Sequence, residues 1–149
     1  MAVDSNLFPD LTYRILGSAM KVHRALGPGL LEKTYRRCLE HELKAEGMQV
    51  ACEVQVDIQY GGLLLEAAYF ADLVIEGKVL LELKAVDQLL PVHSMQVVTY
   101  LKLARLPVGL LINFNESRLT NGLRRFANSA ALEGVPRTVP PVARPLLQP

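Results

Sequence analysis

The sequence predicts an α/β fold, a mixed four-stranded sheet flanked by helices. Apolar and polar residues alternate from Val50 to Tyr60, as in a half-buried strand, and two more strand-like runs follow after short turns. Outside these runs, apolar residues recur at the three- and four-residue spacing of helices. An antiparallel three-strand meander, a crossover helix and one further strand would build such a sheet.

Two helices are expected before the sheet. Asp10 follows Pro9 and precedes an apolar series at helical spacing, so it is predicted as the N-cap of the first helix. That helix stops at the turn Gly27-Pro28-Gly29. The second helix is expected from about residue 30 to residue 45, with Gly47 as its C-terminal stop.

Glycine-containing turns separate the three strands of the meander. Gly61-Gly62 turns the chain into a second strand that runs to about Ile75. The turn Glu76-Gly77-Lys78 then leads into a third strand, Val79 to Lys84. The three strands are therefore expected to be antiparallel neighbours.

The second half of the chain predicts helix, strand and helix. Pro91 opens a helix to about Arg105, residues 108–114 are an apolar run typical of a buried strand, and a last helix is expected over about 119–132. Residues 1–133 are thus predicted to form a single domain. Five prolines in residues 134–149 predict an extended Pro-rich tail.

Composition limits the possible classes of protein. The net charge of +1 gives no general attraction to a polyanion, so nucleic-acid binding would rest on local basic patches. Half of the residues are hydrophobic, which favours a homo-oligomer, most simply a dimer. Cys38 and Cys52 form no metal-binding motif and suit a reduced, cytoplasmic protein. Neither a signal peptide nor an 18-residue apolar run is present, so no membrane association is expected.

The pair Glu82 and Lys84 is the clearest sign of chemistry. Three acid-x-Lys matches occur, but the other two, ending at Lys44 and Lys78, fall on a predicted helix and in a turn. In an apolar strand, charges are costly unless they have partners or a metal. If Ile75 pairs with Val79, Asp72 lies opposite Glu82, and two carboxylates on one face could share a cation. The alternative is an ordinary cross-strand ion pair of Lys84 with a carboxylate.

The predicted crossover helix carries a further polar group. His93, Gln96 and Tyr100 recur at spacings of three and four residues, so they share one helix face. They could line a site beside the strands. The alternative is a polar seam with a half-buried tyrosine.

Several segments in order resemble one known family. Gly29-Leu30-Leu31-Glu32-Lys33-Thr34-Tyr35 is similar to the signature of the GxxExxY protein family, within the PD-(D/E)xK nuclease superfamily. The resemblance covers roughly residues 11–126. It includes the segments Leu26 to Leu30, Ala71 to Leu73, Glu82 to Ala85, His93 to Tyr100, and Leu111 to Asn115.

The resemblance implies a restriction-endonuclease-like core with Asp72, Glu82 and Lys84 as catalytic residues. Glu32 matches the first-helix acid of the superfamily, and Gln96 with Tyr100 matches the Gln-x-x-x-Tyr element of RecB-like nucleases. Substrate positioning is expected of Gln96, Tyr100, His93 and Tyr35. The expected ligands of Mg²⁺ or Mn²⁺ are Asp72, Glu82, the backbone carbonyl of Leu83, and Glu32 through water.

These residues suggest a metal-dependent nuclease that hydrolyses phosphodiester bonds, in DNA more than in RNA. An alternative comes from another class: a catalytically silent nuclease-fold protein that acts as a binding or regulatory partner. The high apolar fraction and low net charge motivate that alternative.

Overall fold

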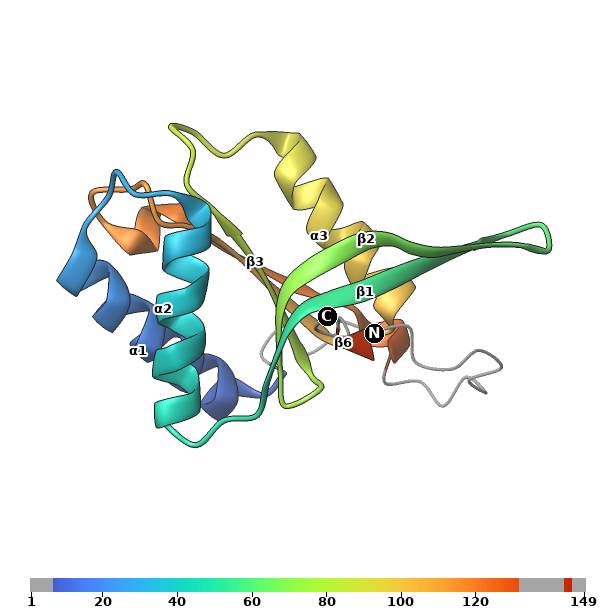
Figure 1. The fold of residues 1–149 in the computed structure, drawn as a ribbon, viewed down its shortest axis with the longest axis horizontal. Helices are drawn as coiled ribbons and strands as arrows, with labels where there is room; N and C mark the ends of the chain where they lie inside the picture. The colour runs from blue at the N-terminus through green and yellow to red at the C-terminus, as the bar shows by residue number, and fades with distance from the viewer. Residues whose placement is uncertain (1–6, 132–143, 146–149) are drawn as a thin grey trace.

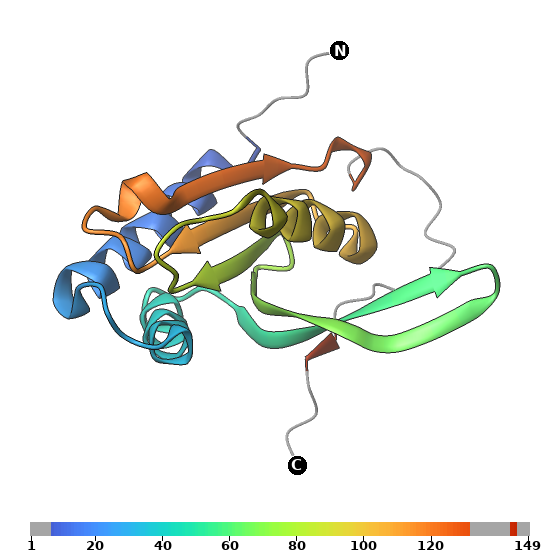
Figure 2. The same cartoon turned by 90° about the horizontal axis from the view of Figure 1, so that it is seen from above.

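A twisted mixed sheet lies between helices on its two faces (Figure 1, Figure 2). The computed structural model describes residues 7–131 and residues 144 and 145. The strand order across the sheet is β5-β4-β3-β2-β1-β6. Helices α1 and α2 share one apolar core with one face of the sheet, and α3 shares a second core with the other face.

The first two helices match the prediction apart from their first residues. Helix α1 spans Pro9–Leu26 and α2 spans Glu32–Ala45. The N-cap of α1 is Phe8 rather than Asp10, which lies in the first helical turn. An aspartate there still favours the helix, because its charge lies near the positive end of the helix dipole.

The meander forms with the predicted register. Strands β1 (Val50–Tyr60), β2 (Leu63–Ile75) and β3 (Val79–Lys84) are antiparallel neighbours, and Ile75 pairs with Val79. Helix α3 (Pro91–Ala104) then crosses over, and β4 (Val108–Asn113) pairs parallel with β3. The expected mixed sheet is therefore confirmed.

The last predicted helix, residues 119–132, was wrong. The chain forms a 3-10 turn η1 (Leu119–Gly122), strand β5 (Leu123–Ala127) and a short 3-10 turn η2 (Ser129–Ala131). Strand β5 pairs antiparallel with β4, so β1 to β5 form five strands where four were expected, and the two-residue strand β6 extends the same sheet at its other edge. A helix is unfavourable here because β4 would keep an open edge, and pairing satisfies its backbone groups.

Part of the Pro-rich tail lies against the sheet. Strand β6 (Arg144–Pro145) pairs antiparallel with Val54 and Gln55 of β1. The rest of the predicted extended tail, residues 134–143 and 146–149, falls outside the described residues.

Helix α3 approaches the sheet closely at Gly109 of β4. A Cβ atom at Gly109 would lie 2.7 Å from a side-chain carbon of Val97 and 3.0 Å from one of Leu101. Both side chains belong to the core under α3. Glycine at this position therefore sets how near the helix lies to the strands that carry the site.

Gly109→Ala is expected to lower the free energy of unfolding by about 1–3 kcal/mol, because the added methyl group overpacks the core under α3. Gly17→Ala is the matched control. Gly17 lies in α1 with open space around it, so alanine there should stabilise by about 0.5–1 kcal/mol. Urea unfolding of both variants measures the difference, and equal values would contradict the close approach of α3.

Candidate active site at the β2–β3 carboxylates

Asp72 and Glu82 face each other where the β2–β3 ladder ends. The last paired residues are Leu73 and Leu81, one step before the two acids. Leu83 donates its N–H to Oδ2 of Asp72 at 2.7 Å, and Asp72 donates its own N–H to Oε1 of Glu82 at 3.2 Å. Each carboxylate is thus fixed by a backbone N–H, and the two acids lie together as the predicted register requires.

Burial makes this pair of carboxylates costly to ionise. Glu82 is 5% exposed, and burial, strengthened by the charge of Asp72, raises its pKa to about 8. Burial also raises the pKa of Asp72 to about 6, although the N–H of Leu83 favours the ionised form. Two neighbouring acids whose pKa values are raised by burial mark a candidate functional site.

Two basic side chains act on these acids. Lys84 follows Glu82 by two residues on β3, and its charge lowers the pKa of both Asp72 and Glu82. Arg36 of α2 places a guanidinium nitrogen 4.0 Å from Oδ1 of Asp72 and another 2.6 Å from Oε1 of Glu53. The sequence alone did not predict that Arg36 lies beside Asp72. Its position four residues after Glu32, on the same helix face, was the available signal.

Glu32 begins α2 on the side of the carboxylate pair. Beside the larger effect of burial, its charge raises the pKa of both Asp72 and Glu82. In the part of the chain that the structure describes, however, no three His, Cys, Asp or Glu side chains come close enough to hold one metal ion. Asp72 and Glu82 are therefore the two carboxylates that lie together here, and Glu32 does not join them as a third.

Helix α3 brings Tyr100 to the pair. Tyr100 is 9% exposed, its ring centroid lies 5.3 Å from that of Tyr69 on β2, and burial together with the nearby Glu82 raises its pKa to about 12. Gln96 lies one turn earlier and is half-buried. The Nδ1 of His93 accepts the N–H of Leu90 at 2.9 Å and so caps the start of α3.

Tyr35 supports a loop and does not line the carboxylate pair. Its fully buried ring stacks on Phe114 at 4.7 Å, and its hydroxyl donates to the carbonyl of Gly27 at 2.5 Å. The same hydroxyl accepts the N–H of Leu30 at 3.1 Å. The loop before α2 is thus held by Tyr35. Glu32 begins that helix, near enough to Asp72 for its charge to raise the pKa of Asp72.

Asn113 fixes the segment that follows Lys84, a role that sequence analysis did not find. Its fully buried side chain accepts the N–H of Val86 at 3.1 Å and donates to the carbonyl of Val86 at 2.8 Å. Phe114 also donates its N–H to the carbonyl of Lys84 at 2.8 Å. A polar residue that ends an apolar strand was the signal, since a buried amide must find partners.

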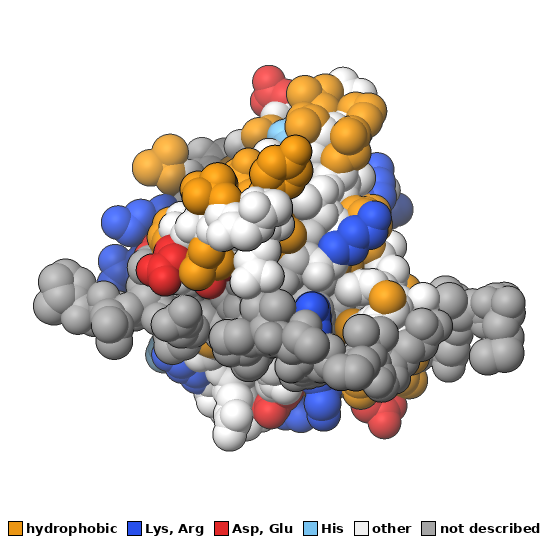
Figure 3. Space-filling view, turned by 90° about the vertical axis from the view of Figure 1, so that its right-hand side faces the viewer, with side chains coloured by type: hydrophobic (Ala, Val, Ile, Leu, Met, Phe, Trp, Pro, Cys, Tyr) orange, Lys and Arg blue, Asp and Glu red, His pale blue; other side chains and the backbone are white. Residues whose placement is uncertain are grey.

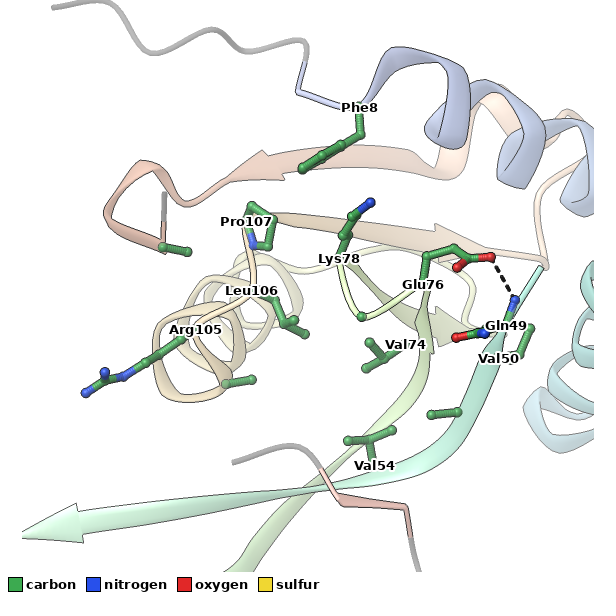
Figure 4. Close-up of a pocket in the computed structure, with 14 residues that line it drawn as sticks. Phe8, Gln49, Val50, Val54, Val74, Glu76, Lys78, Arg105, Leu106 and Pro107 are labelled. Carbon is green, nitrogen blue, oxygen red and sulfur yellow. Dashed lines mark hydrogen bonds between the residues drawn. The ribbon is translucent and has the colours of Figure 1, made fainter. Parts of the chain in front are cut away.

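A large cavity lies elsewhere, away from the two acids. It has a volume of about 610 Å³ beside the β2–β3 turn, with Val54, Val74 and Leu106 among its lining residues (Figure 4). Glu76 at its rim accepts the N–H of Gln49 at 2.9 Å. Neither Asp72 nor Glu82 lines this cavity, so it is not the space in which the two acids would meet a ligand.

Comparison with known proteins gives one match. A family model described as the PD-(D/E)XK nuclease superfamily matches residues 9–126, which include both strands of the carboxylate pair and all of α3. No curated protein and no solved structure matches the chain significantly. Among the described helices, none combines the length and apolarity that crossing a bilayer requires.

Proposed function

The chain belongs to the PD-(D/E)XK nuclease superfamily, and from this premise we propose that it is a metal-dependent nuclease acting on DNA rather than RNA. The observation that carries the proposal is the pairing of Asp72 with Glu82 across two strands, each held by a backbone N–H. Within the superfamily, the GxxExxY family is the proposed branch. Of its signature residues, Glu32 lies near the two acids, and Tyr35 lies under the loop that precedes α2.

The side chains present fit a hard divalent ion, Mg²⁺ or Mn²⁺. Such ions take oxygen donors, and nucleases of this superfamily generally depend on a divalent metal. Asp72, Glu82 and the carbonyl of Leu83 would hold the ion, with Glu32 acting through water. Binding would also offset the cost of burying these two charges, and the smaller repulsion from neighbouring carboxylates, which together raise the pKa values of the two acids.

The chemistry then divides among a few residues. The bound ion would polarise a phosphoryl oxygen and increase the acidity of a water molecule. Lys84 would orient or deprotonate that water and offset the charge that develops on the phosphate. Arg36 adds a second cation beside Asp72, so phosphate attraction is local and does not need a strongly basic chain. Tyr100 and Gln96 would position the substrate or hold Lys84.

A second candidate function is a catalytically silent nuclease-fold protein that binds a partner. One observation favours it: the described residues hold two acids at the site and no third metal-ligating side chain close enough to join them. Either function suits a cytoplasmic protein, the location that we propose, since both Cys38 and Cys52 are free thiols.

The deciding experiment incubates the purified chain with single- and double-stranded DNA and RNA, in Mg²⁺, in Mn²⁺ and in EDTA. Cleavage of DNA that requires the metal is the expected result. Calorimetric titration with Mn²⁺ accompanies the assay. Absence of cleavage on every substrate together with absence of Mn²⁺ binding would overturn the nuclease and favour the silent binding protein.

A further inference from the structure

The far ends of β1 and β2 project from the body of the molecule as a two-stranded arm (Figure 1, Figure 2). We define the arm as residues 57–70, which include the Gly61-Gly62 turn. Strand β3 pairs with β2 only from Leu73 onward, and β6 pairs with β1 only at Val54 and Gln55. Along the arm, neither outer edge pairs with another strand among the described residues.

The arm exposes large apolar side chains on both of its faces. Leu63, Leu64 and Leu65 are consecutive and 54%, 46% and 45% exposed, and neighbours on a strand point to opposite faces. Three aromatic residues are exposed on the same arm: Tyr60, Tyr69 and Phe70. Figure 3, which looks onto this side of the molecule, shows hydrophobic side chains gathered over its upper half. An isolated apolar hairpin of this kind is expected to pack against another surface.

The charges of the arm argue against nucleic acid or anionic lipid as the surface that packs against it. Residues 45–77 contain no lysine or arginine, and the arm's two charged residues, Asp57 and Glu66, are both acidic. Polyanions are bound through cations, which this surface lacks. The arm is therefore suited to a protein surface that is itself apolar and not strongly acidic.

Taken over both of its faces, the exposed apolar area of the arm approaches one half of a stable dimer interface. At roughly 200 Å² per aromatic side chain and about 100 Å² per leucine, the exposed fractions of the six residues amount to ~450 Å². Because an interface is about 60% apolar, this corresponds to about 750 Å² per partner. Stable complexes bury about 800 Å² on each side.

We propose that the arm is the dimer interface between two copies of this chain, related by a two-fold axis. An isologous contact needs a surface that fits itself, and an apolar ribbon with open backbone edges does so without charge complementarity. Each copy would cover the leucines and aromatic residues of the other. Tyr69 joins the interface to Tyr100 beside the acids, yet the dimer does not depend on the nuclease proposal.

The test compares the mass in solution of the full chain with that of the double variant Leu63→Glu/Leu65→Glu, by light scattering at 1–100 µM protein. Both leucines point to one face of the arm, so two buried acids on each copy should dissociate the dimer. The matched control is Leu31→Glu, which replaces a leucine that is 77% exposed outside the arm. The control should remain a dimer.

Circular dichroism separates dissociation from unfolding, since the arm variant should keep the spectrum of the parent chain. A parent chain that is monomeric over this range would overturn the proposal. So would an arm variant that remains as dimeric as the control. If the parent chain is dimeric but cleaves no nucleic acid, that result would instead count against the proposed function alone.

Discussion

Replacing Lys84 by alanine is expected to lower metal-dependent cleavage of DNA by about 10²–10⁴-fold, the usual contribution of a proton-transfer group. The ammonium lies two residues from Glu82 on the same strand face and acts electrostatically on both acids. Its removal leaves the attacking water without the group that would orient or deprotonate it, and the developing phosphate charge without a partner. Single-turnover cleavage with excess enzyme measures the effect on the chemical step.

Lys78→Ala is the matched control for Lys84→Ala. Lys78 follows Glu76 with the same spacing, but it lies in the β2–β3 turn, where its amine sits over the ring of Phe8 at 5.3 Å. This variant should keep the activity of the parent chain. Lys84→Arg separates two roles, because arginine keeps the charge but does not give up its proton. Wild-type activity of Lys84→Ala would rule out a catalytic role for this residue.

Glu82→Gln is expected to stabilise the metal-free protein at pH 8 by on the order of 2–4 kcal/mol, and to abolish stabilisation by Mn²⁺. One unit of pKa shift corresponds to about 1.4 kcal/mol, and burial holds the pKa of Glu82 near 8. The amide keeps an oxygen that can accept the N–H of Asp72 but carries no charge. The same substitution thus removes an electrostatic cost and a metal ligand.

The sign of this pH dependence follows from the order of ionisation. Both Asp72 and Glu82 have raised pKa values in the folded state, so the unfolded chain loses these protons first as the pH rises. The free energy of unfolding of the metal-free protein should therefore fall from about pH 4 to pH 8. Below pH 4, where the acids are protonated in both states, the advantage of Glu82→Gln should vanish.

Urea unfolding across this pH range, in EDTA and in Mn²⁺, checks the prediction for Glu82→Gln. Glu46→Gln is the control, because Glu46 is an exposed acid after the end of α2. It should change neither the pH dependence nor the stabilisation by metal. If Glu82→Gln is less stable than the parent chain at pH 8, or keeps its Mn²⁺ stabilisation, the carboxylate pair is not a cation site.

The position of Asp72 opposite Glu82 could be predicted from the local sequence, whereas the position of Arg36 could not. The three-residue turn after Ile75 determines the β2–β3 register, and the register alone brings Asp72 opposite Glu82. A turn is short-range, so its chemistry can be read from neighbouring residues. The contact of Arg36 with Asp72 is not readable in this way, because it depends on how α2 lies against the sheet.

The helix predicted over residues 119–132 was wrong for a related reason. Residues 123–127 have no strong preference of their own, and the open edge of β4 decides their conformation. Gly122 makes the approach possible, since a Cβ there would lie 2.8 Å from the carbonyl oxygen of Asn113. The close contact with β4 therefore makes residues 123–127 a strand, although their apolar periodicity alone predicted a helix.

By itself the sequence determined the meander, the crossover helix and the carboxylate pair, because periodicity, turns and charge within apolar strands are local properties. Only the tertiary structure decided the role of Tyr35 under the loop, the cap at His93, the position of Arg36 and the fifth strand. The stacking of Tyr35 on Phe114, the contact of Arg36 with Asp72 and the pairing of β5 with β4 join segments distant in the chain. The cap at His93 joins residues only three apart, but it too forms because polar groups take whichever partner the folded chain brings near.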